Sequence, residues 1–259
     1  MKSLILSIAR SICPKRFHSS RVFPAFLHNQ VIQRTRMQVA SGPFSGMRYL
    51  DQSFASVLEP KLLGIYEQEL HQTIEEAVRM EFSKVVDIGA AEGYYAVGLA
   101  MRLPRAGVWA FEAEEAGRAM LRQLVEINNV SDRVTIKGRC LTSDLAGLIR
   151  GGERILIVCD VEGAEEILLD PEVVPGLRQA HMLVELHAKS VPGIGELLAR
   201  RFADTHHIQT VLQEVRTAAD YPYQSFPVNW FPLVYVEKAV SEFRQPWEDR
   251  MSWLWMKPR

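Results

Sequence analysis

Acidic and imidazole side chains follow several apolar runs of this sequence, where they could bind a ligand or move a proton. In chain order they are Asp87 with the turn Gly89–Gly93, then Glu112, the run Asp160–Glu165, and finally Glu185 and His187. Each apolar run is typical of a buried β-strand, and ligands of open α/β sheets bind beyond the carboxyl ends of the strands. We therefore expect these side chains to share one edge of a sheet.

The turn Gly89–Gly93, after the first apolar run, would allow a ligand to lie directly against the backbone. Gly89, Ala91 and Gly93 carry almost no side chain, and the helix expected over residues 94–103 begins directly after them with free N–H groups. Glu112 ends the next strand about 20 residues further on, where a carboxylate can accept hydrogen bonds from both hydroxyls of a ribose. An ordinary strand-to-helix turn and a surface glutamate are the alternative interpretations.

Asp87, two residues before the turn, narrows the choice of ligand. Its carboxylate would repel a pyrophosphate but attract an ammonium group. S-adenosylmethionine carries both an ammonium group and a ribose, so the pattern favours a methyltransferase over an NAD-dependent oxidoreductase. A non-catalytic binding module that keeps the same cofactor fold is a third alternative.

The stretch 85–100 resembles the first motif of the class I S-adenosylmethionine-dependent methyltransferases. Asp160-Val161-Glu162-Gly163-Ala164-Glu165, followed by Leu183-Val184-Glu185-Leu186-His187, resembles the FkbM-type branch of that superfamily. This resemblance covers about residues 60–215. It implies a Rossmann-like α/β fold, with a seven-stranded, mostly parallel sheet and helices on both faces. It also implies S-adenosylmethionine as cofactor and O-methylation of a sugar-containing or other small-molecule acceptor.

The resemblance further implies a set of cofactor contacts. Asp87 and the turn would hold the methionine part, Glu112 the ribose, Cys140 and Leu141 the border of the adenine, and Asp160 the surroundings of the methyl group. The cofactor-binding residues expected in this way are Asp87, Gly89, Ala91, Gly93, Glu112, Cys140 and Asp160. At position 91 many members of the superfamily have glycine, so Ala91 is a mild departure.

Methyl transfer to a hydroxyl needs a group that removes the hydroxyl proton, and a base with a pKa near neutral serves best. His187 is the candidate by residue type, and Glu185 or Asp160 could orient it or act in its place. We assign these three residues to catalysis and no residue to a metal. The same three could alternatively hold a divalent cation, although Ala188 stands where the family often has an acid. The alternative without a role in catalysis is that His187 is a structural polar residue at the end of a strand.

The elements expected to position these residues are β-strands that alternate with helices along the chain. Strands are expected near 84–88, 108–113, 134–137, 155–160, 181–186, 207–212 and 252–256, with helices between them. One helix is expected over residues 60–80 and a short hairpin over residues 36–50. We expect residues 1–59 to form a basic N-terminal extension with an amphipathic helix and that hairpin, and residues 60–259 to form the methyltransferase domain.

Composition and charge limit the function classes. A hydrophobic fraction of 47% is enough for a sizeable core, and three cysteines without metal or disulfide spacing indicate a reducing, cytoplasmic setting. Residues 1–50 contain eight of the 30 Lys and Arg residues and no acid, so the rest of the chain is acidic. We therefore expect no nucleic-acid partner. Residues 1–16 could contact an anionic membrane surface, act as a transit peptide, or pack as a helix.

Overall fold

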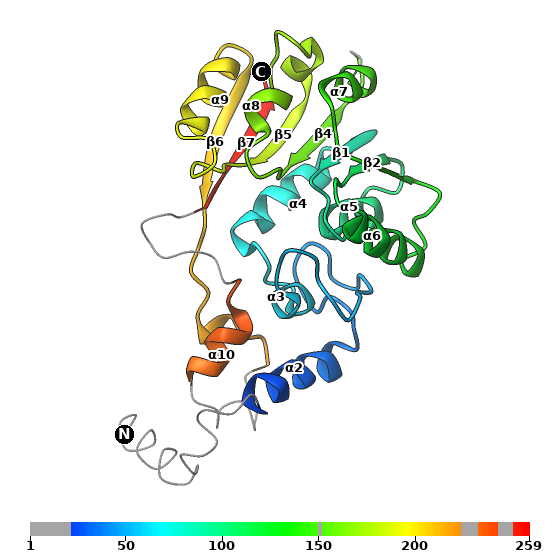
Figure 1. Ribbon diagram of the computed structural model, residues 1–259, viewed down its shortest axis with the longest axis vertical. Coiled ribbons are helices and arrows are strands. Elements are labelled where there is room, and N and C mark those ends of the chain that lie inside the picture. The colour runs from blue at the N-terminus through cyan, green and yellow to red at the C-terminus, as the bar shows by residue number, and fades with distance from the viewer. Residues whose placement is uncertain (1–21, 150–151, 224–232, 243–250) are drawn as a thin grey trace.

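The computed structural model describes residues 22–149, 152–223, 233–242 and 251–259 (Figure 1). These residues form one seven-stranded sheet in the order β3-β2-β1-β4-β5-β7-β6. Neighbouring strands are parallel except β7, which runs antiparallel to both β5 and β6. In chain order the strands are β1 (Lys84–Ile88), β2 (Gly107–Phe111), β3 (Val134–Lys137), β4 (Ile155–Cys159), β5 (His181–Glu185), β6 (His206–Leu212) and β7 (Ser252–Pro258). The predicted Rossmann-like α/β fold is confirmed.

The strands bury both faces of the sheet, because alternate side chains point to opposite sides. In β4, Leu156 and Val158 belong to a first hydrophobic core, whereas Ile155, Ile157 and Cys159 belong to a second core on the other face. Helices add buried side chains to both cores. Among those of the first core are α4 (His71–Arg79), α5 (Tyr94–Arg102) and α6 (Glu115–Ile127), and the second core receives side chains from α7 (Thr142–Leu148), α8 (Glu165–Leu168) and α9 (Ile194–Phe202).

The single helix predicted over residues 60–80 is wrong, because the chain turns inside it. The helix α3 (Leu58–Leu63) ends at Gly64, which has the left-handed backbone (φ 73°) common at helix ends. A Cβ atom at Gly64 would lie only 2.1 Å from the carbonyl oxygen of Ser41, so no larger residue fits there. The chain then passes through the 3-10 helix η2 (Gln68–Leu70) into α4. Apolar spacing alone did not reveal this break.

The N-terminal part contains a helix that the sequence analysis did not predict. This helix, α2 (Val22–Thr35), packs beside α10 (Leu233–Val240) and α3 at the end of the molecule away from the sheet (Figure 1). The expected hairpin of residues 36–50 is present as one antiparallel bridge between Gln38 and Arg48.

The extension predicted for residues 1–59 is described only in part. Its amphipathic helix over residues 1–12 lies outside the described residues, and the division of the chain at residue 59 stays a prediction. None of the helices in the described ranges has both the length and the apolar character needed to cross a membrane.

Candidate active site

The ends of β1 and β4 bring the small-residue turn and Asp160 into contact. The two strands are parallel neighbours, and the Asp160 N–H donates a hydrogen bond to the Ile88 carbonyl oxygen at 2.9 Å. Gly89 has a left-handed backbone (φ 84°), and a Cβ atom there would lie 1.7 Å from the Asp160 carbonyl oxygen. Only glycine fits at this position. The turn is therefore pressed, backbone against backbone, on the residue that follows β4.

Glu112 ties the end of β2 to the same turn. One of its carboxylate oxygens accepts a hydrogen bond from the Ala91 N–H at 2.8 Å, and the other accepts one from the Glu114 N–H at 2.7 Å. The first bond holds Ala91 in a left-handed backbone conformation (φ 48°), which costs a residue other than glycine about 1–2 kcal/mol. Each carboxylate oxygen has a second lone pair, so Glu112 can also accept hydrogen bonds from a ribose.

Asp87 lies in β1 and is 3% exposed. Burial raises the pKa of its carboxyl group to about 8, and the negative charges of Asp160 and Glu112 contribute, against a backbone hydrogen bond from Ala96. The Oδ2 atom of Asp87 has no hydrogen-bond partner among the described residues. A buried carboxyl group in this state favours a cationic ligand, because a positive charge beside it stabilises the ionised form.

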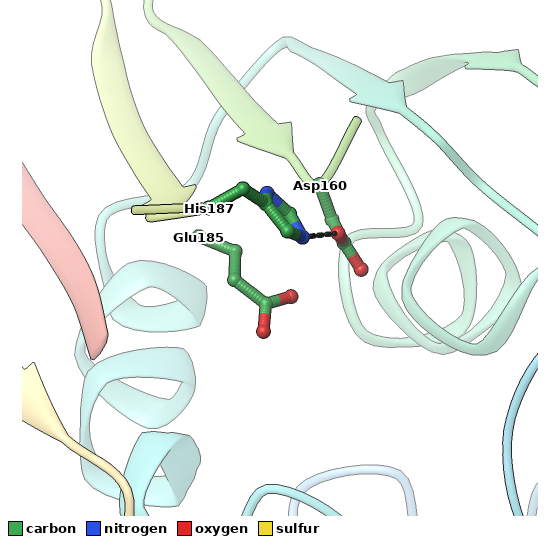
Figure 2. A group of neighbouring side chains, drawn as sticks. All are labelled: Asp160, Glu185 and His187. Atoms are coloured by element: carbon green, nitrogen blue, oxygen red, sulfur yellow. Dashed lines mark ion pairs between the residues drawn. The ribbon is translucent and has the colours of Figure 1, made fainter. Parts of the chain in front are cut away.

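Three ionisable side chains lie together at the ends of β4 and β5 (Figure 2). The Nε2 atom of His187 is 3.3 Å from Oδ1 of Asp160, and the Glu185 side chain lies close to both. On the other side of the ring, Nδ1 of His187 is 2.5 Å from Oε1 of Glu165, whose side chain is fully buried. The structure thus brings together the three residues that we assigned to catalysis. The contact between Glu165 and His187 was not predicted.

The surroundings of His187 favour its protonated form. Burial lowers the pKa of the imidazole, but the hydrogen bond with Glu165 and the negative charges of Asp160, Glu165 and Glu162 outweigh burial and raise it. For Glu165, burial raises the pKa of the carboxyl group, but the hydrogen bond with His187, the charge of His187 and backbone hydrogen bonds together outweigh burial and lower it. Each member of the pair therefore holds its charge more strongly than it would alone.

Cys140 stands just before α7 and is buried in the second hydrophobic core with Phe111. Burial raises the pKa of its thiol to about 12, so the thiol stays neutral and presents an apolar surface. The neighbouring Leu141 is exposed. An apolar pair of this kind is compatible with the border of an adenine site, and that role stays a prediction.

A buried ion pair that the sequence analysis missed fastens the turn to the N-terminal part of the chain. The Nζ atom of Lys61, in α3, lies 2.5 Å from Oε1 of the turn residue Glu92, and both side chains are buried. The same oxygen accepts hydrogen bonds from the hydroxyl groups of Tyr49 (2.8 Å) and Ser53 (2.5 Å). The sequence contains no local motif that predicts this pair. A lysine on a helix and a glutamate in a turn are usually exposed, so neither residue type indicates a buried contact.

Comparison with known proteins gives one relative by sequence. A release factor glutamine methyltransferase from Deinococcus radiodurans is 30% identical over 185 residues, which are 68% of this chain and 63% of that protein. The chain therefore spans less than two thirds of the length of the curated relative that it matches. No protein-family model matches this chain.

Several solved structures are similar to this chain at low identity. A putative caffeoyl-CoA O-methyltransferase from Staphylococcus aureus is 15% identical with a TM-score of 0.45, over 54% of this chain and 76% of that one. A putative O-methyltransferase from Klebsiella pneumoniae is 12% identical with a TM-score of 0.45, over 98% and 96%. The O-methyltransferase TomG from Streptomyces achromogenes, solved with S-adenosylmethionine, is 13% identical with a TM-score of 0.44, over 71% and 77%.

The order of the seven strands, with β7 antiparallel to its neighbours, gives this chain the fold of the class I S-adenosylmethionine-dependent methyltransferases. The turn after β1 stands where that fold carries its first motif. The FkbM-type branch is not distinguished by the sheet or by these likenesses, and it stays a prediction.

Proposed function

We propose that this chain binds S-adenosylmethionine and transfers its methyl group to an oxygen of a sugar-containing or other small-molecule acceptor. The observation that carries the proposal is the backbone contact between Gly89 and Asp160. It sets the turn that would hold the cofactor directly beside the group formed by Asp160, Glu185 and His187. Such a juxtaposition is what a transfer reaction requires, because the donor and the acceptor must meet.

The residues around the turn fit this cofactor. The buried Oδ2 atom of Asp87, without a hydrogen-bond partner among the described residues, would pair with the ammonium group of the methionine part. Glu112 would accept hydrogen bonds from the ribose hydroxyls, and Cys140 with Leu141 would lie along the adenine. A nicotinamide dinucleotide fits less well, because its pyrophosphate would meet the Asp87 carboxylate.

His187 is the residue that we propose as proton acceptor. Bound S-adenosylmethionine supplies a methyl group on a positively charged sulfur, and the carbon–sulfur electron pair stays on that sulfur when the acceptor oxygen takes the methyl group. The hydroxyl proton of the acceptor passes to Nε2 of His187 once this atom is free of its own proton. Glu165 holds Nδ1 and stabilises the resulting imidazolium.

A labelled-methyl transfer screen over sugars, sugar-containing lipids and peptides tests the proposal. Peptides are included because the relative from Deinococcus radiodurans is named for a glutamine in a release factor. We expect label in a sugar-containing or other small-molecule acceptor. We also expect His187→Ala to lose turnover and keep cofactor affinity, with the exposed His207→Ala as the matched control. Cofactor binding without transfer to any acceptor would favour the non-catalytic module, and tight NADH binding would favour the oxidoreductase.

A further inference from the structure

We infer that Asp160, Glu185 and His187 form a binding site for one divalent metal cation. One ligand atom from each residue lies within 4.8 Å of the other two. The residues come from the ends of the adjacent parallel strands β4 and β5, so the sheet itself fixes their spacing (Figure 2). This inference concerns cation binding, which can be measured without an acceptor; only the use of the cation rests on the proposed function.

The orientation of His187 is the observation that points to a cation. Its Nδ1 atom is engaged by the buried carboxylate of Glu165, and the residue as a whole is 8% exposed. The Nε2 atom is buried and makes no hydrogen bond within the described part of the chain, yet it faces Oδ1 of Asp160 at 3.3 Å. If Nδ1 donates its proton to Glu165, Nε2 is either protonated or directs its lone pair at a carboxylate oxygen. In the second case a positive charge between these two atoms makes the arrangement favourable, and a divalent cation supplies that charge in place of the proton.

The contact of Glu165 with Nδ1 of His187 resembles the contacts that orient metal-binding histidines. A histidine that binds a metal usually donates its other ring N–H to a carboxylate, which fixes the tautomer and makes the ligating nitrogen more basic. Glu165 is well suited to this, because its side chain is fully buried and its Oε1 atom lies 2.5 Å from Nδ1 of His187. The exposed carboxylate of Glu162, 3.5 Å from Nε2, adds negative charge on the solvent side.

The donor set selects the class of cation. Two carboxylates and one imidazole suit ions that accept both oxygen and nitrogen, such as Mn²⁺ or Zn²⁺, better than Ca²⁺ or Mg²⁺, which prefer oxygen. With metal–ligand bonds of about 2.1 Å, two ligands are about 3.4 Å apart in a tetrahedral site and at most about 4.2 Å apart on opposite sides of an ion. Side chains must therefore draw together by roughly 1 Å when the ion binds. Three protein ligands also leave coordination positions for water or for an acceptor oxygen.

A cation at this place changes how the acceptor hydroxyl is activated. A divalent ion lowers the pKa of a hydroxyl group that it binds, so the proton can leave to water while the oxygen takes the methyl group. Nε2 then serves as a ligand, and it no longer receives the proton itself. Without the cation, His187 takes the proton as proposed above.

Titration of the full chain with Mn²⁺, followed by calorimetry and by electron paramagnetic resonance, tests the inference. We expect one saturable Mn²⁺ per chain without cofactor or acceptor. Asp160→Asn, Glu185→Gln and Glu165→Gln should each weaken binding roughly 10–100-fold. These substitutions keep the size of the side chain, and circular dichroism checks that the fold persists. His207→Ala, which removes an exposed imidazole, should leave Mn²⁺ affinity unchanged.

Two results would overturn the inference. One is the absence of saturable Mn²⁺ or Zn²⁺ binding to the folded chain up to a concentration of about 1 mM. The other is Mn²⁺ binding that Asp160→Asn and Glu185→Gln leave unchanged, which would place the ion elsewhere. Binding of S-adenosylhomocysteine, measured in the same samples without metal, shows separately whether the proposed cofactor function stands.

Discussion

Oε1 of Glu165 lies 2.5 Å from Nδ1 of His187, and this contact fixes which ring nitrogen faces Asp160. The contact predicts a specific loss in the variant Glu165→Gln. The amide cannot stabilise a positive charge on the imidazole or on a cation beyond it, so turnover should fall on the order of 10–100-fold. Affinity for S-adenosylhomocysteine should stay within about twofold, since Glu165 is not among the residues proposed to hold the cofactor.

The matched control for this prediction is Glu166→Gln, the exposed neighbour on the same helix. Steady-state kinetics and calorimetry on both variants give the comparison. Equal turnover in Glu165→Gln and Glu166→Gln would show that the contact with His187 does not serve the reaction.

Asp87 predicts an unusual dependence of stability on pH in the cofactor-free chain. Burial, followed by the charge of Asp160, raises the pKa of the carboxyl group from 3.8 to about 8. Between these values the folded state keeps a proton that the unfolded chain has released, so the contribution of Asp87 to stability falls as pH rises. Asp87→Asn removes this effect. The variant should therefore be more stable than the original chain at pH 8 and above, on the order of 1–3 kcal/mol, and similar to it near pH 4.

Thermal unfolding from pH 4 to 9 measures this difference, with the exposed Asp204→Asn as control. The same Asp87→Asn variant should bind S-adenosylhomocysteine at least tenfold more weakly, because the ammonium group loses its charged partner. A variant that unfolds as the original chain does at every pH would mean that Asp87 is already ionised at neutral pH.

The Lys61–Glu92 pair predicts a large cost for removing one partner. Lys61→Met leaves the Glu92 carboxylate buried without its cation, which typically costs about 3–5 kcal/mol. The double variant Lys61→Met with Glu92→Gln should recover part of that loss. Urea denaturation measures both, and Arg105→Met, which breaks an exposed ion pair with Glu81, should have little effect. If the double variant is no more stable than Lys61→Met, the buried charge of Glu92 is not the cause.

The variant Gly89→Ala tests the backbone contact between the turn and Asp160. In Gly89→Ala the new Cβ would lie 1.7 Å from the Asp160 carbonyl oxygen, so the turn must move away from the end of β4. Cofactor affinity should fall by more than about tenfold, because the turn no longer fits the ligand. Gly138→Ala, where a Cβ meets nothing within 4 Å, should bind as the original chain does. Unchanged affinity in a folded Gly89→Ala variant would contradict the geometry of the turn.

The strands and the edge they share were predictable, because the central buried strands are apolar runs and the candidate polar residues stand at or just after their carboxyl ends. The run at 155–159 shows this, since both of its faces feed a hydrophobic core. The break at Gly64 was not predictable from apolar spacing, because it depends on the close approach of Ser41, 23 residues earlier in the chain.

The supporting contacts of the site were also beyond the sequence. Glu165 stands 22 residues before His187, and Lys61 stands 31 residues before Glu92. Neither distance along the chain has a periodic signature, and only the tertiary fold brings α8 near the residue after β5, and α3 near the turn. Residue types at strand ends therefore predicted which candidate side chains lie together, but they did not predict which side chains orient them.

Calorimetric titration of the full chain with S-adenosylhomocysteine near neutral pH tests the central claim most directly. We predict saturable binding of one molecule per chain, weakened by Asp87→Asn and Gly89→Ala and unaffected by His207→Ala. A folded chain that shows no binding at millimolar ligand, where even a weak site of about −4 kcal/mol is half filled, would contradict the assignment of the turn to this cofactor.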